Sequence, residues 1–124
     1  MTVKLKTAPM NEQLTPRFGV VLVTAPSQAE ARTIAQTLIA ENLAACVSLL
    51  PVHSIYTWEG AVQQEDEWQL LIKTDLARFS ALETRVRQIH SYEVPEIIAL
   101  PILAGSEAYL NWIATQVETP SPEG

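Results

Sequence analysis

Cysteine and glycine are both scarce in this chain, and each scarcity removes a class of protein from consideration. The single cysteine, Cys46, excludes an internal disulfide and every multi-cysteine zinc site within one chain. The four glycines stand apart from one another, at Gly19, Gly60, Gly105 and Gly124. They form no glycine-rich phosphate loop, which argues against a nucleotide-binding protein.

Basic residues and long apolar runs are also few. Eight Lys and Arg stand against 14 Asp and Glu, a net charge of −6, so neither nucleic acid nor an anionic membrane surface is expected as a partner. No run of about 18 apolar residues is present, so no membrane span is expected. Residues 1–16 lack the apolar stretch of a secretory signal, and we therefore expect a cytoplasmic protein.

The rest of the composition indicates one globular domain. A chain of 124 residues that is 48% hydrophobic can bury about two thirds of its surface. Residues 1–16 and 118–124 show no periodicity and contain prolines, so we expect loose tails there. The single domain is then expected to occupy residues 17–117.

The most informative pattern is a long β-hairpin from Ala44 to about Thr74, with its turn at Glu59-Gly60. Each arm has roughly 14 residues, against about 5–6 in an ordinary strand. Such arms reach about 45 Å, whereas a domain of this size is only about 34 Å across. The overhang carries apolar side chains that one chain cannot bury, namely Ile55, Tyr56, Trp58 and Val62. This length predicts an oligomer in which neighbouring copies cover the hairpin.

The remaining patterns complete the fold. Apolar runs at 18–24 and 96–103 are typical of buried strands. Apolar residues at helical spacing predict helices at about 27–41, from Asp75 or Ser80 to 89, and at 106–117. Ser27 and Glu30 form a capping box at the start of the first helix. The order β-α-β-β-α-β-α predicts an α+β fold, a ferredoxin-like βαββαβ sandwich with a long hairpin and a short C-terminal helix.

The turn also predicts the pairing of the hairpin. A two-residue turn at Glu59-Gly60 pairs residues whose numbers sum to about 119, which places Cys46 opposite Lys73 and His53 opposite Asp66. One apolar set then faces the helices, and it comprises Trp68, Leu70 and Ile72. A bulge near the proline of the first arm would shift the pairing beyond it by one residue.

Six short motifs between about residues 18 and 117 identify a family. They are VLVTAP (21–26), LAACV (43–47), SIYTWEG (54–60), KT (73–74), YEVPEIIALP (92–101) and YLNWI (109–113). In order and spacing they resemble the CutA family, small proteins associated with divalent-cation tolerance. The resemblance implies a ferredoxin-like fold, a tight homotrimer joined through the hairpins, and a role in the response to copper or other divalent metals. In architecture it also resembles the trimeric PII signalling proteins.

The resemblance implies a metal site that this chain only partly retains. In copper-binding members the proposed ligands are a cysteine before Thr-Ala-Pro and a histidine pair before Tyr-x-x-Pro-Glu. Val23 and Ile89-His90 stand at those positions here, leaving His90 as one candidate ligand and Cys46, otherwise a small buried hydrophobe, as another. One imidazole does not make a specific copper site. We therefore expect no required cofactor, and weak Cu(II) binding through surface carboxylates such as Glu65, Asp66 and Glu67.

A second candidate site combines polar and aromatic residues of the family-like segments. It comprises Trp58, Glu67, Lys73, Tyr92 and Glu96, which we expect to meet in a cleft between subunits. Such a cleft could bind a small ligand. The alternative is an interface network in which Lys73 pairs with Glu67 or Glu96 and fixes the subunit geometry.

Several function classes remain open. The first is a non-enzymatic, metal-responsive homotrimer of the CutA type. The alternative is a PII-like regulatory trimer that binds a metabolite or a protein partner in the inter-subunit cleft, and a structural trimer that anchors a partner is a third. An acylphosphatase-like enzyme is not expected, because the first strand-to-helix loop, TAPSQ (24–28), lacks the arginine of a phosphate cradle.

Overall fold

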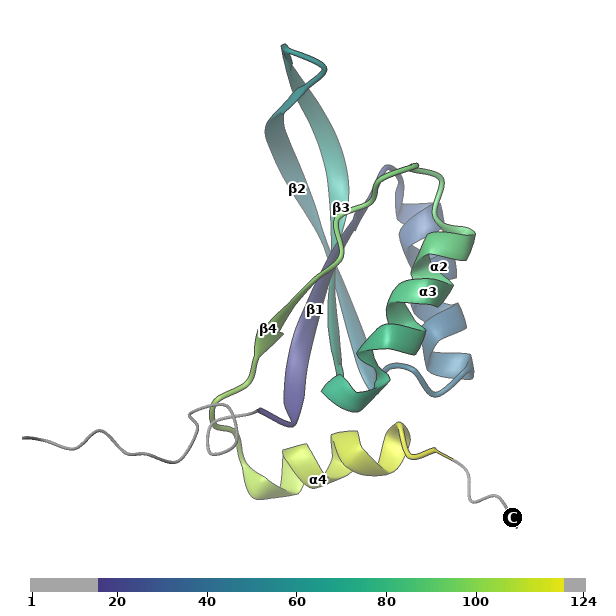
Figure 1. Cartoon of the computed structure of the whole chain (residues 1–124), viewed down its shortest axis with the longest axis vertical. Coiled ribbons are helices and arrows are strands. Elements are labelled where there is room, and N and C mark those ends of the chain that lie inside the picture. Colours follow the sequence, from purple (N-terminus) through teal and green to yellow (C-terminus); the bar gives the residue numbers. More distant parts are fainter. Residues whose placement is uncertain (1–15, 120–124) are drawn as a thin grey trace, which may run out of the picture.

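The elements follow one another in the predicted order. The computed structural model describes residues 16–119 (Figure 1), and the predicted tails at 1–16 and 118–124 lie almost wholly outside them. The elements are β1 (Phe18–Ala25), α2 (Gln28–Ala40), β2 (Cys46–Trp58), β3 (Ala61–Asp75), a 3-10 turn (Leu76–Arg78), α3 (Phe79–Ile89), β4 (Ile98–Pro101) and α4 (Glu107–Gln116). Only the 3-10 turn was not predicted.

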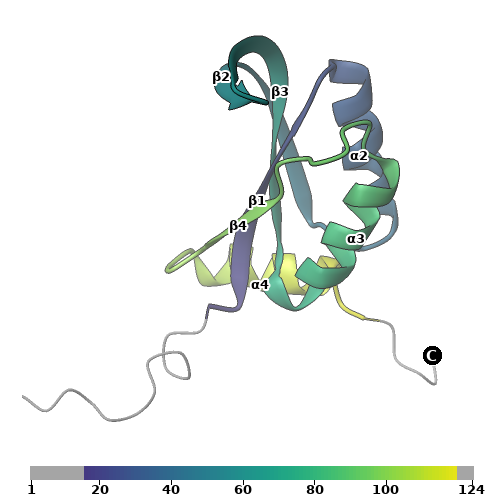
Figure 2. The same cartoon turned by 45° about the horizontal axis from the view of Figure 1, so that its top comes forward.

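The strands form one antiparallel sheet in the order β2-β3-β1-β4. Helices α2 and α3 lie side by side on one face of this sheet (Figures 1 and 2). The predicted α+β, ferredoxin-like sandwich is therefore confirmed, while the homotrimer stays a prediction. Within residues 16–119 no helix is long and apolar enough to cross a membrane.

Short polar side chains cap the helix starts, as predicted for Ser27. The Ser27 hydroxyl accepts the Glu30 N–H at 3.1 Å at the start of α2, and the Ser106 hydroxyl accepts the Tyr109 N–H at 3.2 Å at the start of α4. Of the two caps considered before α3, Asp75 is used, since its carboxylate accepts the Ala77 N–H at 2.9 Å. That cap opens the 3-10 turn that leads into α3.

The core lies between the sheet and the two helices. Alternate residues of β1 and β3 point into it, and the apolar stripes of α2 and α3 close it. Its fully buried members include Val21, Val23, Ile34, Leu38, Leu70, Ile72, Leu82 and Val86. Val23, which stands at the proposed cysteine position, is therefore a core residue.

The hairpin keeps its predicted register along its whole length. Glu59 and Gly60 have φ values of 51° and 80°, as a type I′ turn requires. In every pair from Cys46–Lys73 to Trp58–Ala61 the two residue numbers sum to 119, so the hairpin contains no bulge. The proline of the first arm, Pro51, fits this register because it occupies a non-hydrogen-bonded position opposite Trp68, with its missing N–H on the open edge of β2.

The outer half of the hairpin extends beyond the rest of the sheet. β1 pairs only with Trp68–Asp75 of β3, so residues 61–67 pair with β2 alone. At ~3.3 Å per residue this overhang is about 23 Å long, and it rises clear of the helices in Figure 1. Ile55 is 64% exposed and Val62 is 69% exposed. A single chain leaves these side chains in water.

The last strand corrects one expectation. A buried strand was predicted over 96–103, but β4 covers only Ile98–Pro101 and all four residues are exposed. Ile98 is 50% exposed and Leu100 is 47% exposed. The physical reason is position: β4 is an edge strand that pairs only with β1. An apolar run alone does not reveal whether a neighbour covers it.

Helix α4 packs away from the main core. It lies across the lower end of the sheet in Figure 1, and its buried residue Ile113 is not part of the core cluster between the sheet and α2 and α3. The Lys73 ammonium lies 5.8 Å from the centre of the Tyr109 ring. Lys73 belongs to the β3 face that points away from the core, so α4 covers the lower end of that face.

Candidate functional site

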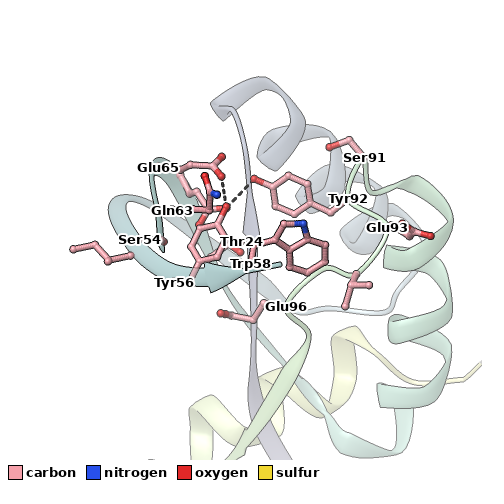
Figure 3. Close-up of a pocket in the computed structure, with 13 residues that line it drawn as sticks. Thr24, Ser54, Tyr56, Trp58, Gln63, Glu65, Ser91, Tyr92, Glu93 and Glu96 are labelled. Atoms are coloured by element: carbon pink, nitrogen blue, oxygen red, sulfur yellow. Dashed lines mark hydrogen bonds between the residues drawn. The ribbon is translucent and has the colours of Figure 1, made fainter. Parts of the chain in front are cut away.

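A cleft of about 830 Å³ opens where the hairpin overhang meets the loop between α3 and β4 (Figure 3). We call it the tip cleft. The hairpin supplies one wall, residues 91–96 supply the other, and the end of β1 forms the floor. Its lining residues are Thr24, Ser54, Ile55, Tyr56, Trp58, Gln63, Glu65, Glu67, Ser91, Tyr92, Glu93, Val94 and Glu96.

The tip cleft contains four of the five residues predicted to meet in a cleft: Trp58, Glu67, Tyr92 and Glu96. Lys73 is not among its lining residues. It follows Glu67 by six positions on β3, about 20 Å along the strand, and contacts the Tyr109 ring instead. Within one chain Lys73 therefore does not join this group, and its place in a cleft between subunits stays a prediction. The proximity of a second subunit to the tip cleft stays a prediction.

The 91–96 loop is fastened to the body of the domain by hydrogen bonds at Ser91 and Tyr92. The Ser91 N–H donates to the Glu30 carboxylate at 2.9 Å, so the capping-box glutamate reaches the loop. The Tyr92 N–H donates to His90 Nδ1 at 2.9 Å. The Tyr92 hydroxyl donates to the Glu67 carboxylate at 2.8 Å and joins the loop to β3 across the cleft.

His90 is a structural residue in this arrangement. Its side chain is fully buried, Nδ1 accepts the Tyr92 N–H, and Nε2 lies 2.7 Å from the Thr24 carbonyl oxygen. Because a carbonyl can only accept, Nε2 carries the proton and the ring is the neutral Nε2–H tautomer. Neither nitrogen is free to bind a metal. Copper ligation by His90 stays a prediction, and it would require one of these two backbone contacts to break.

Cys46, the other candidate ligand, lies apart from His90 in the chain. It is half-buried at the base of β2, opposite Lys73, whereas His90 follows α3 at the other end of the sheet. Within residues 16–119 no group of three or more His, Cys, Asp or Glu side chains is placed to hold a metal ion. The predicted His53–Asp66 pair does form, with Nδ1 2.8 Å from the carboxylate, on the exposed hairpin.

Two tyrosine–glutamate pairs lie in the tip cleft. Tyr56 donates its hydroxyl hydrogen bond to Glu65, and Tyr92 donates to Glu67 (Figure 3). Burial and, next, the hydrogen bond to Glu67 raise the pKa of Tyr92 well above its usual value of 10.0. The hydrogen bond to Glu65 is the main cause that raises the pKa of Tyr56 to about 12. Both phenols therefore stay neutral at physiological pH.

The charges in the tip cleft all have one sign. Glu65, Glu67, Glu93 and Glu96 line it, and no Lys, Arg or His is among the lining residues. Glu67 is only 6% exposed, which is unusual for a carboxylate. A cavity of this kind favours cations and repels anions.

Tyr56 and Glu65 were not predicted as part of this site, although the predicted hairpin register already places them close together. Tyr56 pairs with Gln63, which puts Glu65 at the diagonal position on the neighbouring strand, within reach of a long side chain. Ser91 was also not predicted, because its backbone N–H holds it in the loop and side-chain patterns do not reveal such a contact.

The comparisons with known proteins agree on one family. The family model described as CutA1 divalent ion tolerance protein matches residues 19–116. The divalent-cation tolerance protein CutA of Thermus thermophilus is 50% identical over 95 residues, which is 76% of this chain and 92% of the relative.

Solved structures give the same result. The periplasmic divalent cation tolerance protein CutA from Archaeoglobus fulgidus superposes with a TM-score of 0.81 at 38% identity, covering 82% of this chain and 99% of the other. CutA1 from Oryza sativa superposes with a TM-score of 0.81 at 40% identity, covering 85% and 97%. With its fold, its six motifs and these relatives, the chain belongs to the CutA1 family of divalent ion tolerance proteins.

Proposed function

We propose that this chain acts in the tolerance of divalent cations as a non-enzymatic homotrimer that binds Cu(II) weakly, through exposed carboxylates of the hairpin. The observation that carries the weak binding is the engagement of both His90 nitrogens by backbone groups. With Val23 in the core, the two positions where copper-binding relatives are proposed to place ligands offer no soft donor. Glu65 and Asp66 on the overhang remain accessible to hydrated metal ions.

The metal part is tested by calorimetric titration of the full chain with CuCl2. We expect weak, low-enthalpy binding that is the same in His90→Ala and that falls when Glu65 and Asp66 are both replaced by their amides. Submicromolar Cu(II) affinity that disappears in His90→Ala would contradict the proposal.

The physiological part is tested by growth. The chain is expressed in a bacterial host that lacks its own CutA, and growth is followed over a series of CuCl2 and ZnCl2 concentrations. We expect the intact chain to extend growth to higher metal concentrations than an empty vector. Equal growth of the two strains at every concentration of both metals would reject the tolerance role.

The homotrimer is supported by the apolar side chains that the overhang leaves in water, among them Ile55, Trp58 and Val62. The exposed strand β4, at the opposite edge of the sheet, is a second apolar surface that a neighbouring copy could cover. Light scattering at micromolar concentration should return about three times the chain mass of 13.7 kDa. A single chain mass would rule out the trimer.

The cytoplasm is the proposed compartment. The periplasm is the competing location, because the relative from Archaeoglobus fulgidus is named a periplasmic protein. Fractionation of cells that express the chain from its natural first residue separates the two. Recovery in the periplasmic fraction would overturn the cytoplasmic assignment. The PII-like regulatory alternative is not supported, because the family model and the relatives described above are divalent-cation tolerance proteins.

A further inference from the structure

Glu67 presents a charge without a basic partner. Its carboxylate is on a side chain that is 6% exposed, and it accepts a hydrogen bond from the Tyr92 hydroxyl. Within residues 16–119 no Lys, Arg or His forms an ion pair with it, and no such residue lines the tip cleft. Buried carboxylates in proteins are normally paired with a cation. A cation from outside the chain would supply the missing charge.

The walls of the tip cleft indicate the kind of cation. The rings of Tyr56, Trp58 and Tyr92 gather around the opening in Figure 3, and Trp58 is 49% exposed. Aromatic faces attract organic cations and offer apolar contact area, which a hydrated metal ion cannot use. A bare divalent metal needs several oxygen ligands at about 2.0–2.6 Å, and no group of three ligating side chains is available within residues 16–119.

We propose that the tip cleft binds a small organic ammonium ion, with its nitrogen against the Glu67 carboxylate and its apolar part against the Trp58 and Tyr92 rings. A carboxylate offers about four lone-pair positions, so Glu67 can accept from the ammonium while it holds the Tyr92 hydroxyl. Glu65 and Glu96 add charge of the same sign at the rim. The volume of about 830 Å³ is ample for such a ligand.

This inference goes beyond the tolerance of divalent metals and does not depend on it. The other candidate occupant is a basic side chain of a second copy, which would fill the cleft in the assembled protein. These two occupants predict opposite results for a soluble ammonium probe.

The test is a titration of the full, assembled chain with benzylammonium chloride, followed by calorimetry and tryptophan fluorescence. Benzoate is the matched anionic probe at equal ionic strength, and CuCl2 is titrated separately. We expect saturable benzylammonium binding with a Kd on the order of 1 mM or tighter, and no saturable benzoate binding. Absence of benzylammonium saturation up to about 20 mM, or equal binding of benzoate, would overturn the proposal, whatever CuCl2 does.

Variants locate the binding. Glu67→Gln keeps the shape and the acceptor for Tyr92 but removes the charge, and we expect it to weaken benzylammonium binding about tenfold. Trp58→Ala should weaken binding about fivefold and abolish most of the fluorescence change. Glu83→Gln, on α3 outside the cleft, is the matched charge control and should bind as the parent does.

Assembly is checked for each variant by light scattering, because Trp58 also belongs to the overhang. Glu96→Gln, at the exposed rim, provides a variant that does not depend on the buried carboxylate or on the overhang, and it should weaken binding about threefold. If Glu67→Gln, Glu96→Gln and Glu83→Gln all bind as tightly as the parent chain, the ammonium site is not in the tip cleft.

Discussion

His90 offers the sharpest test of how this site is built. Replacement by alanine removes a fully buried ring whose two nitrogens hold the Thr24 carbonyl and the Tyr92 N–H at 2.7 and 2.9 Å. Each buried polar group left without a partner costs about 1–3 kcal/mol, and the space left by the ring adds to this. We expect His90→Ala to lower the free energy of unfolding by about 3 kcal/mol.

The chain contains its own control for this experiment. His53 also has both nitrogens engaged, with Asp66 at 2.8 Å and Gln64 at 3.2 Å, but it lies on the exposed hairpin where water replaces lost partners. His53→Ala should leave the unfolding midpoint nearly unchanged. Both variants are compared with the parent chain by guanidinium unfolding at one fixed protomer concentration, because assembly contributes to the measured stability.

The two possible roles of His90 give different results. A ligand histidine would lower copper affinity on mutation and leave the apparent stability without copper close to that of the parent chain. The structural role predicts the reverse: a large loss of stability with copper binding unchanged. A His90→Ala protein as stable as His53→Ala would refute the structural role.

Replacing residues 55–62 by a short turn should give a folded monomer by light scattering, and a persisting trimer would show that the overhang is not needed for assembly. The hydrogen bonds to Asp66 and then Gln64 raise the pKa of His53 above 6.5. The stabilisation of the folded chain by these bonds is therefore complete below pH 6.5 and is lost as the pH rises through the folded-state pKa. An NMR titration that gives His53 a pKa at or below 6.5 would contradict this. Burial and Glu67 raise the pKa of Tyr92 above 10.0, so stability should fall as pH rises past 10.0, and less steeply in Tyr92→Phe; identical alkaline unfolding curves would argue against it.

The hairpin could be predicted almost completely, because a single local feature determines it. Once Glu59 and Gly60 form a two-residue turn, every pair down to Cys46–Lys73 is set, and the alternation of apolar side chains agrees with that choice. Helix starts were equally local, since Ser27 and Ser106 bond to backbone groups three residues away.

The site was harder to predict, because its key partners are distant in sequence. The sequence alone suggests His90 as a metal ligand. It does not reveal that the ring nitrogen Nε2 bonds to the Thr24 carbonyl, which is 66 residues away. Lys73 and Glu67 share a strand face, but a shared face does not bring two residues six positions apart into one cleft. The exposure of Ile98 and Leu100 depends on what neighbours the chain has, which their apolar character does not encode.

Pro51 has a consequence for how copies of this protein can join. It lies near the middle of the edge strand β2 and offers no donor on the side that faces outward. A strand from another copy could pair with β2 only up to Pro51, where the backbone N–H is missing. A continuous hydrogen-bond ladder along all of β2 is therefore blocked. A small, closed assembly is thereby favoured over open-ended addition of strands into filaments, even though the free edge of β2 is unusually long.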